Sequence, residues 1–318
     1  MIPLRLTPAC KDYLWGGTKL ITEYGKQTDK DKMAESWELS CHPDGESRVA
    51  GGPYDGLTLP EALERMGTGA LGERGAAFSQ FPLLIKLIDA RDRISIQVHP
   101  DDAYALRVEG EYGKTEMWYV VDCEEGAGLY LGFSHPVGRE EFAQRIEEGT
   151  LEQVLRRVPV KPGDSFFIPA GTLHAIGAGI LIAEIQQNSN TTYRVYDYGR
   201  LGTDGKPRPL HVEKALEVTD TCPANTPAPG TPKVCPGGSV TELASCRYFT
   251  AEAVALSGRL EDTCDGGSFR HLLVLSGQAK LCWAGGEETL RKGDSLFLPA
   301  GLGPYALEGE AKLLRSRV

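Results

Sequence analysis

A short segment that occurs twice constrains the fold of this chain more than any other feature. Residues Lys161–Gly171 read KPGDSFFIPAG, and residues Arg291–Gly301 read RKGDSLFLPAG. Glycine, aspartate and proline favour turns, and the apolar run between them suits a short buried strand. Each copy follows an expected pair of strands, at 118–133 and at 271–281. The repetition therefore predicts that one β unit is present twice in the chain.

The turn–strand–turn pattern is typical of the C-terminal hairpin of a cupin-type jelly roll. We therefore expect a mainly β fold with two cupin-type jelly-roll β-barrels and a few helices inserted in the N-terminal part. Apolar runs predict strands at 81–89, 94–98, 117–121 and 128–133. The pattern also predicts a helix that starts near Asp101 and two short helices within 139–158.

A stretch rich in proline and glycine divides the chain at 223–239. The 318 residues are enough for two domains with separate cores. We expect a catalytic, metal-binding domain at 1–222, a linker at 223–239, and a degenerate cupin-like β domain at 240–318. The second domain is expected to lack metal ligands, because Pro304 stands where the first copy of the repeat has His174.

Four side chains that can bind a metal lie in or next to the first unit: Gln97, His99, Glu116 and His174. In the expected strand at 94–98, the alternation of polar and aliphatic residues places Ser95, Gln97 and His99 on one face. Two imidazoles, one carboxylate and one amide oxygen suit a divalent ion such as zinc. We expect one Zn²⁺ per chain.

Basic side chains beside these residues indicate an anionic substrate. Lys114 is two residues before Glu116, so both side chains share one strand face. Arg194 lies in the aromatic-rich strand expected at 193–198. An inward-facing arginine requires an anionic partner, which a bound substrate would supply. Residues 183–194 also form an unusually polar stretch after an apolar run.

The composition narrows the choice of partners and compartment. The net charge of −10 argues against nucleic acid or an anionic membrane surface as a general partner. No apolar run approaches the length of a membrane span, and the N-terminus does not resemble a signal peptide. The 8 cysteines form no Cys-x-x-Cys pair, so free thiols in a reducing cytoplasm are expected. The sequence leaves the oligomeric state open between a monomer and a homodimer.

An ordered set of motifs resembles the type I mannose-6-phosphate isomerases of the cupin superfamily, in their short bacterial form. The resemblance covers nearly the whole chain, and three motifs carry most of it. These motifs are Ile96–Asp102 (IQVHPDD), Gly113–Trp118 (GKTEMW) and Pro169–His174 (PAGTLH). Longer relatives often have Asn-His-Lys-Pro-Glu around the second motif. Here glycine stands at position 113, so no side chain acts there.

The resemblance implies roles for eight positions. The metal ligands would be Gln97, His99, Glu116 and His174. The substrate-binding residues would be Ser95, Lys114 and Arg194, and the catalytic residues would be Arg194, Lys114 and Glu184.

The implied reaction interconverts mannose 6-phosphate and fructose 6-phosphate through a cis-enediol. We therefore expect a small-molecule sugar phosphate as the partner. As the enediol forms, negative charge develops on the sugar oxygens, and nearby cations can stabilise it. The base that moves the proton stays open between Glu184, a zinc-bound water and a histidine. The sequence also leaves open which cation, Lys114 or Arg194, binds the phosphate.

Two other functions are compatible with parts of the pattern. Two histidines and a carboxylate also form the facial triad of mononuclear iron oxygenases. Gln97 as a fourth ligand argues against that function, because oxygen activation needs open coordination positions. The second alternative is a non-catalytic, metal-containing cupin that binds a sugar phosphate. The presence of Lys114, Glu184 and Arg194 together argues against such a loss of catalysis.

Overall fold

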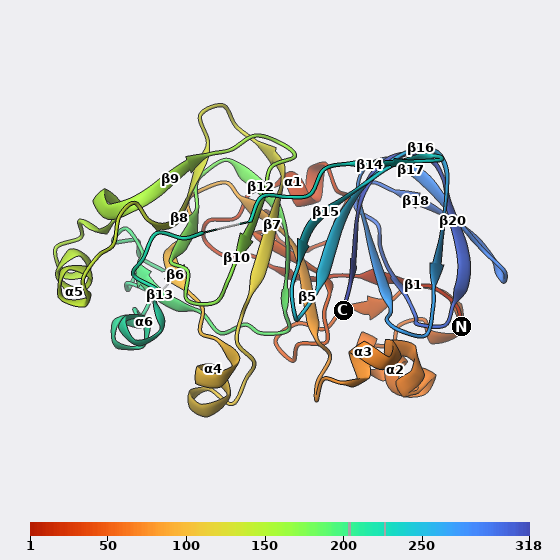
Figure 1. Ribbon diagram of the computed structural model, residues 1–318, viewed down its shortest axis with the longest axis horizontal. Helices are drawn as coiled ribbons and strands as arrows, with labels where there is room; N and C mark the ends of the chain where they lie inside the picture. Colours follow the sequence, from red (N-terminus) through yellow and green to blue (C-terminus); the bar gives the residue numbers. More distant parts are fainter. Residues whose placement is uncertain (203–204, 226) are drawn as a thin grey trace.

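The protein is built mainly from antiparallel β-strands, as Figure 1 shows. The computed structural model describes residues 1–202, 205–225 and 227–318. The strands form three sheets of nine, six and five strands. The expected mainly β fold is therefore confirmed. Residue 226 of the linker expected at 223–239 lies outside the described residues.

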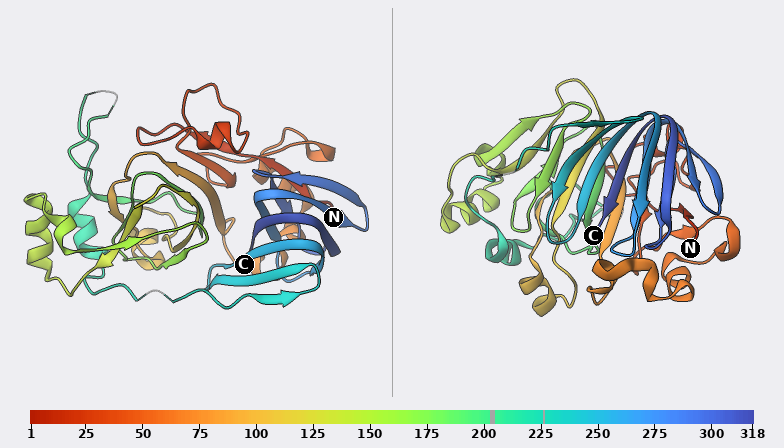
Figure 2. Two further views of the ribbon diagram at one scale, coloured as in Figure 1. Left: turned by 90° about the horizontal axis from the view of Figure 1, so that it is seen from above. Right: turned by 45° about the vertical axis from the view of Figure 1, so that its right-hand side comes forward.

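The nine-stranded sheet contains all the strands after residue 230 together with two strands from the N-terminus. In spatial order its strands are β14 (Lys233–Cys235), β15 (Gly238–Ser245), β16 (Thr250–Cys264), β20 (Gly303–Arg317), β17 (Arg270–Trp283), β19 (Ser295–Leu298), β1 (Leu4–Thr7) and β4 (Arg48–Val49), and β18 (Gly286–Arg291) pairs with β17. Figure 2 shows the N-terminus among the blue C-terminal strands. The two ends of the chain thus build one sheet.

The other two sheets come from residues 9–196. The six-stranded sheet has the order β10 (Ser165–Ile168), β7 (Glu116–Cys123), β12 (Ile180–Gln187), β5 (Leu83–Ala90), β3 (Glu35–Leu39) and β2 (Ala9–Lys11). The five-stranded sheet has the order β13 (Tyr193–Tyr196), β6 (Ile96–Val98), β11 (His174–Ile176), β8 (Gly128–Phe133) and β9 (Leu155–Pro159).

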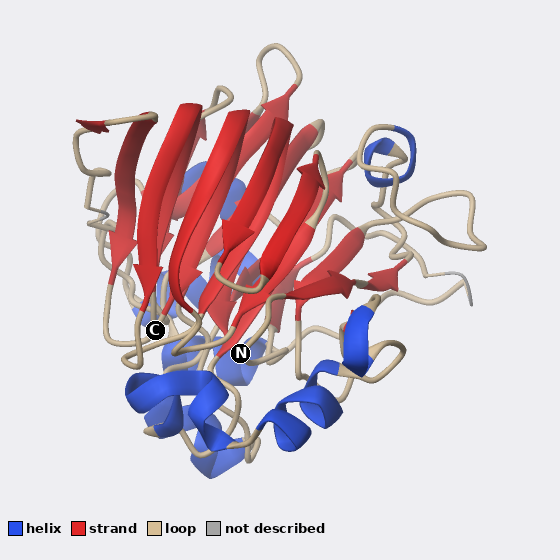
Figure 3. Ribbon diagram, turned by 90° about the vertical axis from the view of Figure 1, so that its right-hand side faces the viewer, coloured by secondary structure: helices blue, strands red, loops and turns tan. Residues whose placement is uncertain are grey.

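The helices are short, and Figure 3 shows most of them at one end of the strands. The α-helices are α1 (Lys19–Thr22), α2 (Leu59–Met66), α3 (Gly72–Ala76), α4 (Asp102–Val108), α5 (Arg139–Glu147) and α6 (Val212–Val218), and the 3₁₀ turns are η1 (Gly52–Tyr54), η2 (Thr68–Leu71) and η3 (Leu151–Val154). The second helix expected within 139–158 is instead η3 followed by β9. Among the described residues, none of these helices is long and apolar enough to cross a membrane.

The central strands of the six-stranded sheet are buried on both faces. On β5, Leu83, Ile85 and Leu87 pack into a core shared with the nine-stranded sheet, whereas Ile88 and Ala90 join a separate cluster on the opposite face. The period of two also places Lys86 on that opposite face. This double burial explains why β5 reads as a nearly continuous apolar run, in which Lys86 is a conspicuous exception.

The two copies of the repeat form equivalent strands, β10 and β19. β10 pairs with β7, and β19 pairs with β17, so each copy pairs with an earlier strand of its own part of the chain. The pairing of the described strands closes none of the three sheets into a barrel. The two jelly-roll barrels and the division at 223–239 therefore stay predictions.

Candidate active site

Three expected site residues form a row across the five-stranded sheet. Gln97 on β6 lies opposite His174 on β11 and, on its other side, opposite Arg194 on β13. Residues directly opposite each other on neighbouring strands project to the same face of a sheet. The register therefore directs these three side chains to one side of the sheet, although they are far apart in the sequence.

A second row crosses the six-stranded sheet. Glu184 on β12 lies between Trp118 on β7 and Lys86 on β5. The indole Nε1 of Trp118 donates a hydrogen bond of 3.0 Å to Glu184 Oε2. Lys86 Nζ lies 3.3 Å from Glu184 Oε1. The Trp118 and Lys86 contacts fix both oxygens of this buried carboxylate.

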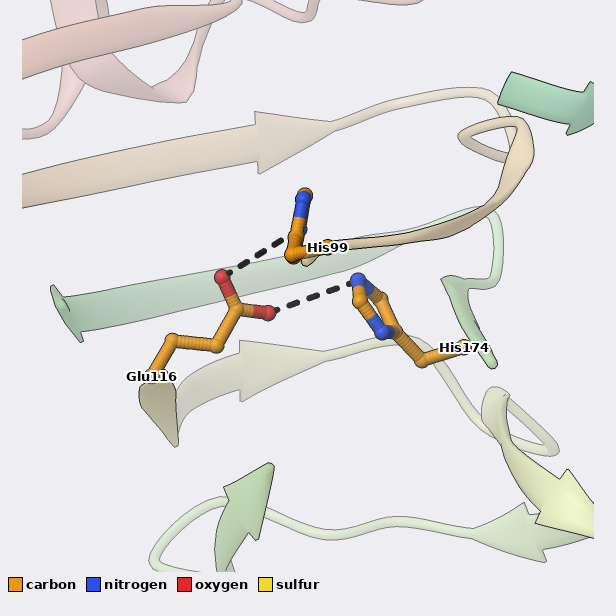
Figure 4. Close-up of side chains that lie close together, drawn as sticks. All are labelled: His99, Glu116 and His174. Atoms are coloured by element: carbon orange, nitrogen blue, oxygen red, sulfur yellow. Dashed lines mark ion pairs between the residues drawn. The ribbon is translucent and has the colours of Figure 1, made fainter. Parts of the chain in front are cut away.

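The carboxylate of Glu116 faces both expected metal-binding histidines, as Figure 4 shows. Its Oε2 lies 3.6 Å from His99 Nε2, and its Oε1 lies 3.4 Å from His174 Nε2. The three side chains are almost completely buried. One atom from each lies within 4.8 Å of the other two. Among the described residues, this is the one group of three or more histidine, cysteine, aspartate or glutamate side chains that could hold a metal ion.

The donor set fits a divalent metal ion. His99 Nδ1 is 2.9 Å from the carbonyl oxygen of Thr191, and His174 Nδ1 is 2.8 Å from that of Thr172. A carbonyl oxygen only accepts, so in each ring Nδ1 carries the proton and Nε2 keeps its lone pair, which can bind a metal ion. His174 Nε2 and Glu116 Oε1 are buried and have no hydrogen-bond partner. A metal ion is the usual partner for unsatisfied atoms of this kind.

Burial keeps both imidazoles in the form that binds metal. It lowers the pKa of His174 to about 4 and holds the pKa of His99 well below its ordinary value, with the charge of Lys114 adding to the effect on His99. Both rings are therefore neutral near pH 7. Burial and the charge of Glu184 together raise the pKa of the Glu116 carboxyl. A bound cation would oppose that rise.

Lys114 joins the metal-ligand group to Glu184. Its Nζ lies 2.9 Å from Glu116 Oε2 and 3.5 Å from Glu184 Oε1. Burial acts to lower the pKa of Lys114, but the two carboxylates outweigh it and raise the pKa. Burial acts to raise the pKa of Glu184, but Lys114 and Lys86 outweigh it and lower the pKa to about 2. Lys114 is therefore a buried cation and Glu184 a buried anion.

A cavity of about 260 Å³ opens beside these groups. The expected site residues that line it are Ser95, Gln97, Lys114, Glu184 and Arg194. Aromatic and aliphatic side chains line it as well, including Tyr13, Trp15, Trp118 and Ile176. Charged groups of both signs beside aromatic and aliphatic side chains are typical of a site for a small polar ligand.

Arginines form another part of the cavity wall. Arg194 is half-buried, and its Nε is buried without a hydrogen-bond partner. Arg208 also lines the cavity, and Asp197 holds it with two bonds, from Nε at 2.7 Å and from the terminal nitrogen at 2.6 Å. Burial lowers the pKa of Arg194, and the charge of Arg208 lowers it further. Two neighbouring guanidinium groups favour an anionic ligand here.

Comparisons with known proteins identify the family. A family model described as "Phosphomannose isomerase type I, catalytic domain" matches residues 3–124, and "Mannose-6-phosphate isomerase, cupin domain" matches residues 239–318. The "Probable mannose-6-phosphate isomerase GmuF" of Bacillus subtilis is 42% identical over 325 residues, which cover 99% of this chain and 98% of the relative. The chain belongs to the type I phosphomannose isomerase family.

Other members of the type I phosphomannose isomerase family match over equally complete lengths. The mannose-6-phosphate isomerase of Streptococcus mutans is 39% identical, with 99% of this chain and 98% of the relative covered. A crystal structure of the mannose 6-phosphate isomerase from Bacillus subtilis superposes with a TM-score of 0.94 at 38% identity, and both chains are covered completely. The family expected from the motifs is thus confirmed.

The structure brings the expected site residues together in and beside one cavity. His99, Glu116 and His174 form the buried triad, and Gln97 lies opposite His174 at the cavity wall. The Oγ of Ser95 donates a hydrogen bond of 3.2 Å to Gln97 Oε1 and so orients this amide. The individual catalytic and substrate-binding roles stay predictions.

Sequence reasoning missed two cations at the cavity, Lys86 and Arg208. A signal for Lys86 was present, because a single charge inside the apolar run 83–88 must face a polar site or an ion pair. No comparable signal marked Arg208, which lies in the polar loop that follows β13. It reaches the cavity through its contact with Asp197.

The second copy of the repeat lacks two of the corresponding ligands. In the first unit Ile168 pairs with Glu116, and in the second unit the corresponding Leu298 pairs with Arg270. An arginine thus occupies the register position of the carboxylate, and Pro304 stands in place of His174. The expectation that the C-terminal unit has no metal ligands stays a prediction.

Proposed function

We propose that the protein is a zinc-dependent aldose–ketose isomerase that interconverts mannose 6-phosphate and fructose 6-phosphate through a cis-enediol. One observation carries the proposal: the buried triad of His99, Glu116 and His174 adjoins a cavity lined by Lys114, Glu184 and Arg194. The relatives named mannose-6-phosphate isomerase match the chain from end to end, which supports the same substrate.

The proposed metal site uses Gln97, His99, Glu116 and His174 for one Zn²⁺ per chain. Two nitrogen and two oxygen donors suit this ion, and the backbone carbonyls behind both histidines orient the rings. A bound zinc ion supplies Lewis acidity that stabilises negative charge on the sugar oxygens.

Lys114 and Arg194 supply the protein's own positive charge in this proposal. The two carboxylates within 3.5 Å of Lys114 keep its ammonium group charged beside the reacting carbons. Arg194 offers an unsatisfied Nε at the cavity wall, and Ser95 positions the Gln97 amide. We assign the phosphate to the Arg194 side of the cavity, where Arg208 adds a second guanidinium group.

Glu184 is the proposed base. Its Oε1 accepts no hydrogen bond, although it forms ion pairs with Lys86 at 3.3 Å and Lys114 at 3.5 Å, and the side chain lines the cavity. The carboxylate takes the proton from C2 of the aldose while O1 gains a proton, which gives the cis-enediol. The same carboxyl then returns the proton to C1 while O2 loses its proton, which gives the ketose. Lys114 is a poorer choice of base, because its two carboxylate partners favour the protonated ammonium.

We also propose how the sheets divide into two jelly rolls and in which compartment the protein works. The six- and five-stranded sheets would form the catalytic jelly roll, with the cavity between their two residue rows, and the nine-stranded sheet would form most of the second. All eight cysteines, which lie within the described part of the chain, are free. Free thiols support a reducing compartment such as the cytoplasm.

The test is isomerisation of mannose 6-phosphate to fructose 6-phosphate before chelation, after chelation, and after zinc is returned. Activity that disappears and then recovers is the expected result. A zinc-loaded protein that binds the sugar phosphate without turnover would instead favour a binding module. Oxygen consumption by the iron-loaded protein would favour an oxygenase.

A further inference from the structure

The side chains of Lys114 and Glu116 depend on the backbone of the residue between them. Thr115 N–H donates a hydrogen bond of 2.9 Å to Gln187 Oε1, and Gln187 N–H donates one of 3.1 Å to the Thr115 carbonyl oxygen. Both residues are buried. Side chains alternate along an extended chain, so a clamp on Thr115 fixes the direction of both neighbours.

The clamp on Thr115 is itself held by the carboxylate of Asp102. Asp102 Oδ1 accepts hydrogen bonds of 2.9 Å from Gln187 Nε2 and from the backbone N–H of Gly113. Asp102 Oδ2 accepts a hydrogen bond of 2.9 Å from the hydroxyl of Tyr248, which belongs to the C-terminal unit. One carboxylate therefore joins the start of α4, the chain before Lys114, the end of β12 and the C-terminal unit.

The contact at Gly113 is too close for any other residue. A Cβ at this position would lie 2.3 Å from the backbone carbon of Asp101 and 2.4 Å from the nitrogen of Asp102. The next residue continues the contact, because Lys114 N–H donates to the carbonyl oxygen of Pro100 at 3.0 Å. The turn that follows His99 is thus bound directly to the segment that carries Lys114 and Glu116.

We propose that Asp102 is a positioning residue for the active site, and that Tyr248 makes the C-terminal unit part of the same support. Asp102 acts through Gly113 and Gln187 to hold the backbone from which Lys114 and Glu116 reach the metal-ligand group. The catalytic part of this inference rests on the proposed isomerase function. It gives the second β unit a role at a site to which it contributes no metal ligand.

The adjacent Asp101 provides a matched control. It is also a carboxylate in the turn after His99, but its Oδ1 accepts from the backbone N–H of Tyr104 at 2.9 Å and caps α4. Loss of this cap lowers stability without releasing Gly113 or Gln187. Comparing substitutions of Asp101 and Asp102 therefore distinguishes an effect on the stability of this turn from an effect on the metal and substrate site.

The test compares three variants by zinc affinity, measured by competition with a chelating indicator, by kcat and KM, and by thermal unfolding. Asp102→Ala should lower zinc affinity and kcat by roughly 10- to 100-fold, the range for removing an outer hydrogen-bond partner of a metal site. Asp102→Asn should keep most of the zinc affinity and most of kcat, because its amide oxygen can accept the hydrogen bonds from Gly113 and Gln187. Asp101→Ala should lower the melting temperature alone.

Tyr248→Phe tests the contribution of the C-terminal unit and is the second route if Asp102→Ala does not fold. It removes one hydrogen bond, so zinc affinity and kcat should fall by roughly two- to tenfold. Zinc affinity and kcat equal to those of the parent in both Asp102→Ala and Tyr248→Phe would overturn the inference. Equal losses of zinc affinity in Asp102→Ala and Asp101→Ala would also overturn it.

Failure of the proposed function gives a different result. If the unmutated, zinc-loaded protein does not interconvert the two sugar phosphates, the isomerase proposal fails. The order of zinc affinities among the variants still tests whether Asp102 positions Glu116.

Discussion

Gln97 and His174 lie directly opposite each other in the register of β6 and β11, although 76 residues separate them in the sequence. The pairing directs an amide and an imidazole to one face of the five-stranded sheet. His174 Nε2 then meets Glu116, which comes from the six-stranded sheet. Side chains on hydrogen-bonded strands are held more rigidly than side chains on loops.

Substitution of His174 should remove metal without unfolding the protein. His174→Ala deletes one imidazole donor, so zinc affinity should fall by more than the roughly 10- to 100-fold that loss of an outer partner costs. Zinc content and affinity after dialysis measure the effect. The exposed His135 is the control, because His135→Ala should keep the parent's affinity. A His174→Ala protein that binds zinc as tightly as the parent would exclude this residue as a ligand.

Substitution of Arg194 should impair turnover and leave the metal in place. Arg194→Ala removes a guanidinium group from the cavity wall but none of the triad, so zinc content should stay at the parent's value. Loss of comparable charge stabilisation costs about 10²- to 10³-fold in rate. Steady-state kinetics measure this loss, and Arg65→Ala on the exposed side of α2 is the control. Normal turnover in Arg194→Ala would rule out a role for Arg194 in the reaction.

Substitution of Glu184 should stop proton transfer between the two carbons. Glu184→Gln keeps the shape and can still accept from Trp118 but is no longer a base, so the exchange of the C2 hydrogen with solvent deuterium should fall together with turnover. NMR of the sugar phosphate follows both quantities. Exposed Glu140→Gln should behave like the parent. Exchange at the parent's rate in Glu184→Gln would transfer the role of base to another group.

The ion pairs of Asp197 should give the protein a pH-dependent increment of stability. Burial acts to raise the pKa of Asp197, but the guanidinium groups of Arg208 and Arg200 outweigh it and lower the pKa. The ion pairs therefore make their full contribution to the free energy of unfolding above the pKa of the unfolded carboxyl, which is about 3.9. The contribution is lost as the pH falls through the lower pKa of the folded state.

Asp197→Asn should accordingly lower the free energy of unfolding at pH 7 by roughly 1.5–3 kcal/mol, the range for hydrogen bonds to charged groups. The difference from the parent should shrink in acid. Urea unfolding at several pH values measures it, with exposed Asp31→Asn as the control. A difference that stays constant down to the most acidic pH would contradict the assignment to these ion pairs.

Local patterns were sufficient to predict much of the site. Alternation placed Lys114 and Glu116 on one face, and the structure finds them 2.9 Å apart. The repeat predicted equivalent strands at 165–168 and 295–298, and both are present. These features depend on the period of two in a strand and on turn-forming residues, which act over a few positions.

Local patterns failed where a segment's structure depends on distant neighbours. The second helix expected within 139–158 is a 3₁₀ turn and then β9, because Leu155–Pro159 pairs with β8. The apolar residues whose spacing predicted a helix, Leu151, Val154 and Leu155, are still buried in one core, but they reach it from a 3₁₀ turn and a strand. Likewise, β1 at the N-terminus joins the sheet of the C-terminal unit through β19.

The sequence by itself determined the residue types of the proposed metal group and the family to which the chain belongs, and it predicted that Lys114 and Glu116 lie together. Only the tertiary structure decided that Lys86 contacts Glu184, that Arg208 reaches the cavity, and that Tyr248 supports the site through Asp102. The physical reason is distance along the chain. Each of these contacts joins strands or loops whose meeting is set by sheet register and by packing between units, and neither is encoded in a local run of residues.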